Sequence, residues 1–237
     1  MIKLYQFSPT WGLPNLSHFA VKVETYLRMA GLPYEVVPTY PFTGPKRKLP
    51  YIEDNGKKIA DSRFILDYLK ATYGDTLDGH LSAEERAILT ALQRMIEESF
   101  YWVTMATRWQ GSEANWQENK NAIFGRLPPV IRDIAAFVYR HFIIKRQIYG
   151  QGTGRLTEEE IYHVGKVDLD AMSDFLAGKS YFLGERPSSL DATAYGFLAN
   201  TVACPVESPV KEYALAKGNL VAYCQRMQKQ FFPELSN

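Results

Sequence analysis

Hydrophobic and polar positions in the first 76 residues follow two different periods. Stretches in which they alternate, or run apolar, predict four strands, at residues 2–7, 34–40, 48–52 and 57–60. Apolar positions three to four residues apart predict two helices, from Ser17 to Ala30 and from Asp61 to about Tyr73. The predicted order is strand, helix, strand, a loop at 41–47, strand, strand and helix. Because a helix connects the first two strands, we expect them to be parallel.

From residue 77 onward the pattern is helical. A capping box at Ser82 begins a helical run that continues to about Trp109. A polar stretch at 111–120, which we expect to be a mobile rim, separates it from a second run that ends near Gly150. Further helices are predicted at 157–177, from 188, and once or twice within 210–232. The sequence thus predicts an α/β domain at 1–76 and an all-α domain at 77–237.

Composition limits the expected binding partners and cellular compartment of the protein. Its net charge of +1 gives no strong field, so neither nucleic acid nor an acidic membrane is an expected partner. The two cysteines, Cys204 and Cys224, form no CxxC pair and fit a reducing compartment best. The N-terminus has no signal-peptide pattern, and no apolar run reaches the ~18 residues of a membrane helix. These features predict a cytoplasmic protein without a transmembrane segment.

Three short sequences indicate more than a fold. Leu49-Pro50 precedes the third predicted strand, and Asp61-Ser62 begins the second predicted helix after a hairpin signal. The third sequence, Ser188-Ser189-Leu190-Asp191, has the spacing of a capping box. Taken alone, the first is compatible with an ordinary trans proline at a sheet edge, and the second with a plain helix cap.

Together these sequences resemble the glutathione transferase superfamily. The sequence from Asn15 to Ala30 is similar in particular to the metaxin and failed-axon-connections branch. The resemblance implies a thioredoxin-like first domain with a cis bond before Pro50, followed by a helical second domain. It also implies a detoxification enzyme with glutathione as co-substrate, and a homodimer. The import role of metaxins does not carry over, because the chain lacks their membrane anchor.

The same resemblance assigns four residues to glutathione binding. The backbone of Leu49, turned by Pro50, would pair with the peptide like an added strand. Ser62, at the start of a helix, would bind the γ-glutamyl carboxylate through its hydroxyl and backbone N–H, because helix N-termini attract anions. Asp61 would face the α-amino group of the ligand.

Ser17 is the candidate catalytic residue. The thiolate is the nucleophile of glutathione chemistry, and a hydrogen-bond donor beside a helix N-terminus stabilises it. Related branches have Cys or Ser at this place, and a Ser suits conjugation rather than disulfide reduction. Ser17 could equally be only a helix cap. Tyr5 is the rival donor, although its pattern fits the core better, and His18 fits a solvated helix start better than a base.

The second substrate is expected to meet aromatic side chains. Candidate acceptor-pocket residues are Trp11, Tyr101, Trp102 and Met105, although a stripe with this helical spacing is typical of a domain interface. No His or Cys spacing predicts a metal. We therefore expect a transferase that conjugates glutathione to an electrophilic, partly apolar small molecule. Two alternatives stay open, namely a non-catalytic binding or assembly protein of this fold, and a glutathione-dependent reductase or isomerase.

Overall fold

A four-stranded mixed sheet forms the first part of the structure, a computed structural model that describes residues 1–40 and 43–235. Its strands are β1 (Ile2–Gln6), β2 (Tyr34–Pro38), β3 (Tyr51–Asp54) and β4 (Lys57–Ala60). The spatial order is β2-β1-β3-β4, with β1 parallel to β2 and antiparallel to β3. The predicted order of strands and helices is confirmed. Residues 41–42, the start of the predicted loop 41–47, lie outside the described residues.

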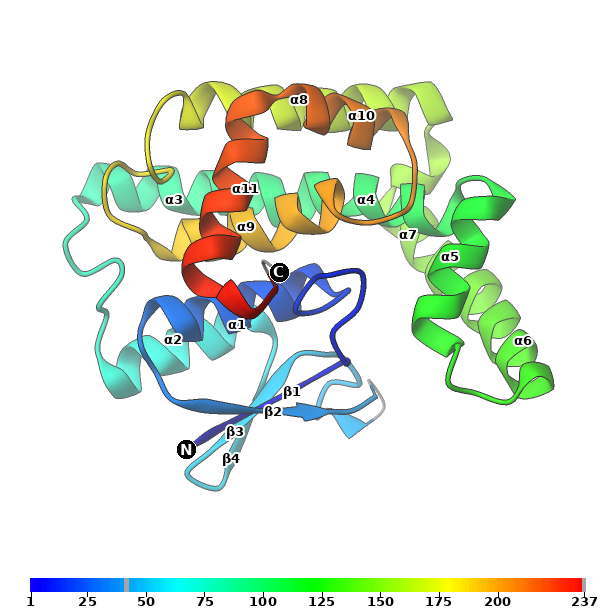
Figure 1. Cartoon of the computed structure of the whole chain (residues 1–237), viewed down its shortest axis with the longest axis horizontal. Helices are drawn as coiled ribbons and strands as arrows, with labels where there is room; N and C mark the ends of the chain where they lie inside the picture. Colours follow the sequence, from blue (N-terminus) through cyan, green and yellow to red (C-terminus); the bar gives the residue numbers. More distant parts are fainter. Residues whose placement is uncertain (41–42, 236–237) are drawn as a thin grey trace.

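Two helices, α1 (His18–Met29) and α2 (Ser62–Tyr73), cover one face of this sheet (Figure 1). Alternate strand residues such as Leu4 and Ile52 pack against them in a fully buried apolar cluster. The predicted single apolar face of α1 is incomplete. His18, Lys22 and Glu24 are also buried, because a helix of the second domain packs on the other side of α1.

The remainder of the described chain is helical. Its longer helices are α3 (Ala83–Arg94), α4 (Tyr101–Gln110), α5 (Glu113–Phe124), α6 (Pro129–Val138), α7 (Lys145–Gln151), α8 (Glu158–Leu176), α9 (Ser189–Val202), α10 (Pro209–Ala216) and α11 (Gly218–Phe231). Short π-helical segments, η2 (Met95–Phe100) and η3 (Tyr139–Ile144), join α3 to α4 and α6 to α7. Two 3₁₀ turns, η4 (Thr153–Arg155) and η5 (Pro233–Leu235), complete the order.

The polar stretch at 111–120 is mostly helical, because most of it belongs to α5, and a mobile rim there stays a prediction. Ser112 caps the helix by accepting a hydrogen bond from the Asn115 backbone N–H at 3.3 Å. The Asn115 side chain then bonds the backbone N–H and carbonyl of Glu207. Trp116 is buried against the main core. One polar residue of this stretch, Asn115, therefore bonds a neighbouring loop, whereas Ser112, Glu113 and Glu118 are exposed.

Helix α9 joins the two parts of the molecule. Its predicted capping box is present, with both Asp191 carboxylate oxygens accepting hydrogen bonds, at 2.8 Å from the Ser188 N–H and 2.9 Å from the Phe182 N–H. At Gly196 the helix approaches the backbone of α1 closely. A Cβ atom there would lie 2.7 Å from the His18 carbonyl oxygen and 2.9 Å from the Lys22 nitrogen. Only glycine permits this close contact.

Candidate glutathione-binding site

Strand pairing places two of the predicted site residues, Pro50 and Asp61, at the same end of the sheet. Tyr5 near the end of β1 pairs with Tyr51 at the start of β3, and Tyr51 pairs with Ala60 at the end of β4. The residues next in line at this end are therefore Pro50 and Asp61. The Leu49–Pro50 peptide bond is cis, as expected.

Ser17 is the N-cap of α1. Its Oγ accepts a hydrogen bond from the Ala20 backbone N–H at 3.4 Å, and its own N–H donates to Asn15 Oδ1 at 3.0 Å. The side chain is half-buried. Since a hydroxyl that accepts one bond still has a proton to donate, the capping role leaves the O–H of Ser17 available for a ligand.

The second domain holds the loop that leads to Ser17. The Arg108 guanidinium, buried in α4, donates to the Leu16 carbonyl at 2.8 Å and to the Asn200 carbonyl and Oδ1, each at 2.8 Å. The Asn200 amide donates in turn to the Asn15 carbonyl at 3.3 Å. Arg108 also lies over the Trp11 ring, 5.3 Å from its centre. Two polar residues far along the chain thus fix the backbone of this loop.

Asp61 and Ser62 form the N-terminus of α2. Asp61 is the N-cap, with a φ of 82°, and its exposed carboxylate accepts from the Arg63 N–H at 3.2 Å. Ser62 is buried, and its Oγ accepts a hydrogen bond from Lys22 Nζ at 3.4 Å. An ammonium group can only donate, so this bond does not use the Ser62 hydroxyl proton. Ser62 therefore presents hydrogen-bond donors at the positive end of a helix.

Lys22 is fully buried beneath Ser62. Its Nζ lies 2.5 Å from Glu97 Oε1, and Gln93 donates to the same oxygen at 3.0 Å. Burial lowers the pKa of Lys22, and the Glu97 carboxylate acts in the opposite direction. A buried charge is stable only when it is paired. Glu97, on η2 of the second domain, therefore holds the cation that orients Ser62.

Tyr5, the alternative to Ser17 as donor, and His18, the neighbour of Ser17, lie in environments other than those expected. Tyr5 is half-buried on the sheet face that α1 and α2 leave free, because strand alternation places it on the side opposite to Leu4. Its hydroxyl donates to Glu53 at 3.3 Å, and desolvation together with this carboxylate raises the pKa of Tyr5. His18 is buried rather than solvated, because α9 covers the start of α1. Burial, and then the Arg108 charge, hold the pKa of His18 well below its usual range.

The candidate acceptor residues lie at the domain interface. The Tyr101 ring contacts Phe19 of α1, with 4.9 Å between ring centres, and Trp102 contacts Tyr101 at 5.2 Å. Met105 is buried one turn further along α4. Trp11 lies across the loop against Arg108. Of the predicted stripe, Tyr101 thus contacts the first domain directly, and a role of these residues in binding a second substrate stays a prediction.

The roles of Lys22, Arg108 and Asn200 were not predicted from the sequence. Their partners lie 40 to 185 positions away along the chain, so no local spacing reveals them. The one local signal for Lys22 was its position between two valines in α1. Within residues 1–40 and 43–235, no three His, Cys, Asp or Glu side chains gather as a metal site requires. In the same ranges no helix combines the length and apolar character needed to cross a bilayer.

A thioredoxin-like sheet domain joined through α1 and α9 to a helical domain is the architecture of the glutathione transferase fold. A family model described as the glutathione S-transferase N-terminal domain matches residues 18–116. A second model, the glutathione S-transferase C-terminal domain, matches residues 165–227. Together with the relatives described next, these matches show that the chain belongs to the glutathione S-transferase family.

Three relatives illustrate the breadth of this family. The isoprene-epoxide–glutathione S-transferase of Rhodococcus sp. strain AD45 is 36% identical, over 98% of this chain and 99% of its own length. Failed axon connections of Drosophila melanogaster is 35% identical over 99% of this chain, which spans 59% of that longer protein. Metaxin-1 of Mus musculus is 27% identical over 98% of this chain and 75% of its own length.

Solved structures agree on the fold. A glutathione S-transferase of Ceriporiopsis subvermispora, crystallised in complex with glutathione, superposes with a TM-score of 0.65 over 97% of each chain. Its sequence is 19% identical. At this identity the similarity shows the fold alone.

Proposed function

We propose that this protein joins glutathione to a small, partly apolar electrophile, and that an epoxide represents the substrate class. The observation that carries the proposal is Ser62, buried at the N-terminus of α2 with its oxygen engaged by Lys22. Its hydroxyl proton and the positive end of α2 suit an anion such as the γ-glutamyl carboxylate of glutathione. The Rhodococcus relative, similar over its whole length, supports the epoxide because its name specifies one.

The peptide is held along the edge of the sheet. The Leu49 backbone, preceding Pro50, pairs with the ligand main chain, and Asp61 faces its α-amino group with an exposed carboxylate. Ser62 binds the carboxylate next to that amine. The sulfur then lies toward Ser17, at the start of the neighbouring helix.

Ser17 donates its hydroxyl proton in a hydrogen bond to the sulfur and stabilises the thiolate, whose own proton leaves to solvent. The thiolate attacks an epoxide carbon, the carbon–oxygen bond breaks, and its electron pair stays on the ring oxygen, which takes a proton from water. Trp11, Tyr101, Trp102 and Met105 are the proposed contacts of the electrophile. The engagement of the Tyr5 hydroxyl by Glu53 favours Ser17 over Tyr5 as the donor.

Calorimetric titration with glutathione tests the binding step. Ser62→Ala is expected to weaken binding by roughly tenfold to a hundredfold, the range for a lost hydrogen bond to a charged group. Ser82→Ala, which removes the cap of α3 on the helical domain, is the matched control and leaves the affinity unchanged. If the unmodified protein takes up no glutathione at millimolar concentration, both enzyme hypotheses are wrong, and a non-catalytic binding or assembly role replaces them.

A glycine at position 17 separates catalysis from capping. At an N-cap, Ser→Gly costs only a few tenths of a kcal/mol, so Ser17→Gly removes the hydroxyl with little loss of stability. The thiolate absorbance of bound glutathione is then titrated, and turnover is followed with isoprene monoepoxide. We expect the thiol pKa to return toward that of free glutathione and turnover to fall at least tenfold. Unchanged turnover would show that Ser17 is only a cap.

A further inference from the structure

Helix α6 and segment η3 expose an unusual amount of apolar surface. Of the fifteen large hydrophobic side chains exposed among the described residues, seven lie within positions 130–143. This group, which we call the α6 face, consists of Val130, Ile131, Ile134, Phe137, Val138, Phe142 and Ile143. Their exposed fractions run from 39% to 72%. Exposed apolar patches of this kind mark interaction sites in soluble proteins.

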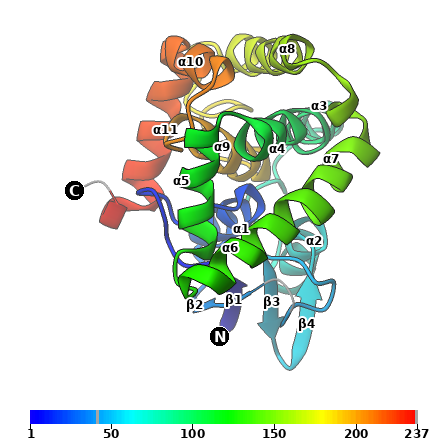
Figure 2. The ribbon, with the colours of Figure 1, turned by 90° about the vertical axis from the view of Figure 1, so that its right-hand side faces the viewer.

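The orientation of α6 is the reverse of that expected for a surface helix. A surface helix normally turns its large apolar side chains toward the core. In α6, Ala136 is the buried residue, whereas Ile134 and Phe137 on either side of it are 61% and 55% exposed. Figure 1 shows α5 and α6 at one end of the molecule, and Figure 2 shows α6 and α7 along that end face. The apolar side of α6 is therefore available to a partner.

The segment that carries the α6 face is rich in positive charge. Residues 121–155 contain six Lys or Arg and one Asp, whereas the other 202 residues contain 21 Lys or Arg and 25 Asp or Glu. Within the described residues Arg126, Lys145, Arg146 and Arg155 form no ion pair with a carboxylate. The near-zero net charge of the whole chain thus hides a strongly basic segment in an otherwise slightly acidic protein.

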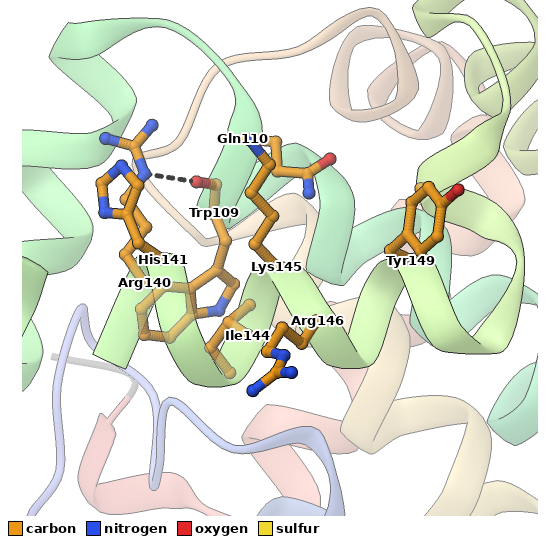
Figure 3. A pocket seen from close by; sticks show the side chains of 9 residues that line it. Trp109, Gln110, Arg140, His141, Ile144, Lys145, Arg146 and Tyr149 are labelled. Carbon is orange, nitrogen blue, oxygen red and sulfur yellow. Dashed lines mark hydrogen bonds between the residues drawn. The ribbon is translucent and has the colours of Figure 1, made fainter. Parts of the chain in front are cut away.

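A pocket of about 680 Å³ lies beside this face, between the end of α4 and the η3–α7 segment. Figure 3 shows Arg140, Lys145 and Arg146 around it, with Trp109 and Tyr149 among its walls. Arg140 is held by a 2.8 Å bond to the Trp109 carbonyl. Among the described residues that line this cationic pocket there is no carboxylate. Its chemistry suits an anionic group such as a phosphate.

The charge pattern and the shape of this region distinguish between possible binding partners of the α6 face. A second copy in a two-fold dimer would place the same basic segment opposite itself, and like charges across an interface are unfavourable. A helix of another protein needs a groove, whereas α6 forms a projecting edge of the molecule (Figures 1 and 2). A bilayer surface accepts a projecting helix, with apolar side chains at the acyl boundary and cations at the phosphates.

We propose that the α6 face and the cationic pocket dock this protein on a membrane surface that contains anionic phospholipids. Val130, Ile134 and Phe137 enter the boundary between headgroups and acyl chains. Lys145 and Arg146 bind lipid phosphates. The proposal is independent of glutathione chemistry, because none of these residues belongs to the proposed glutathione site.

Vesicle sedimentation with the full chain tests the proposal. Vesicles of phosphatidylcholine alone are compared with an equal mixture of phosphatidylcholine and phosphatidylserine. We expect binding to the mixed vesicles that weakens as salt screens the charges. Replacing both cations, Lys145→Gln with Arg146→Gln, should lower the partition coefficient about twenty-five-fold, at roughly fivefold for each cation. The control pair Lys57→Gln with Lys58→Gln, in the β3–β4 hairpin, makes the same charge change and should have no effect.

A second pair of variants tests how much the apolar side chains contribute to vesicle binding. Ile134→Ser with Phe137→Ser should abolish the binding that remains at high salt, whereas Val167→Ser with Leu215→Ser, exposed on α8 and α10, should not. Failure of the unmodified protein to sediment with mixed vesicles at low salt would overturn the proposal, as would equal binding to both vesicle types. Sedimentation velocity gives a third check. If the protein ignores vesicles and Ile134→Ser with Phe137→Ser turns a dimer into a monomer, the face joins two copies instead.

Discussion

Helices α6 and α9 are both rich in apolar residues but occupy opposite environments. Every residue of α9 from Ser189 to Thr201 is buried, whereas Ala136 is the buried residue of α6. The difference follows from the neighbours that each helix has. Helix α9 packs against α1, α3, α10 and α11, and Gly196 lets it lie directly against α1, so that even Tyr195 and Phe197 are buried. Helix α6 packs mainly against α5 and η3 at one end of the molecule. The apolar content of a helix therefore does not show by itself whether the rest of the chain covers it.

The largest effect should come from Gly196→Ala. A methyl group there would overlap the backbone of α1, which cannot move aside as a flexible side chain can. We expect the free energy of unfolding in urea to fall by about 3 kcal/mol, at the upper end for overpacking. Gly150→Ala in α7 is the control, because its Cβ would meet no atom within 4 Å. It should stabilise the protein slightly, and equal losses for both variants would contradict the close approach of α9.

The free energy of unfolding should depend on pH through Asp168, a buried residue of the helical domain that has no counterpart on the exposed α6 face. Asp168 on α8 accepts a hydrogen bond from Ser99 Oγ at 2.7 Å, and burial raises its pKa to about 6. In the unfolded chain an Asp has a pKa of about 3.9. The folded state thus retains a proton that the unfolded state releases. The resulting stabilisation is complete below about pH 4 and is lost as the pH rises through 6, an effect of about 2 kcal/mol.

Asp168→Asn provides the measurement, because the amide is neutral at every pH and still accepts from Ser99. The unfolding free energies of the two proteins are compared between pH 4 and pH 7. Their difference should change by about 2 kcal/mol across this range, with the wild type losing stability relative to the variant as pH rises. A constant difference would show that Asp168 is ionised in the folded protein.

The smallest effect should come from Ile134→Ala on the α6 face. Because this side chain is 61% exposed, its truncation should change the unfolding free energy by less than about 0.5 kcal/mol. Ile148→Ala in α7, where the side chain is fully buried, makes the same chemical change and should cost at least about 2 kcal/mol. A large loss at position 134 would mean that the α6 face is covered within the chain.

Local patterns were sufficient to predict most of the fold. The four strands, both helices of the first domain and the capping box at Ser188 come from periodicity and cap residues close in sequence. Helix α5 was missed because its polar residues resemble a loop, and their partner at Glu207 lies 92 positions away. Strand ends also differed: the strand predicted at 34–40 ends at Pro38, where its pairing with β1 stops.

The candidate site was predictable only in part. Ser17, Leu49-Pro50 and Asp61-Ser62 can be proposed from the sequence because helix starts and a proline before a strand are local signals. Lys22 was not, since its significance depends on Glu97, 75 positions along the chain. The basic character of residues 121–155 was hidden because a net charge averages over regions that lie far apart in space.

The bonds from Arg108 and Asn200 to the loop before Ser17 have a consequence for engineering. The part of the proposed site around Ser17 depends on both domains, since the side chains that hold the preceding loop come from α4 and α9. Excising residues 1–76, or recombining them with the helices of a relative that differs at positions 108 and 200, would release this loop even if the sheet still formed. A working chimaera should therefore exchange α4 and α9 together with the sheet that they support.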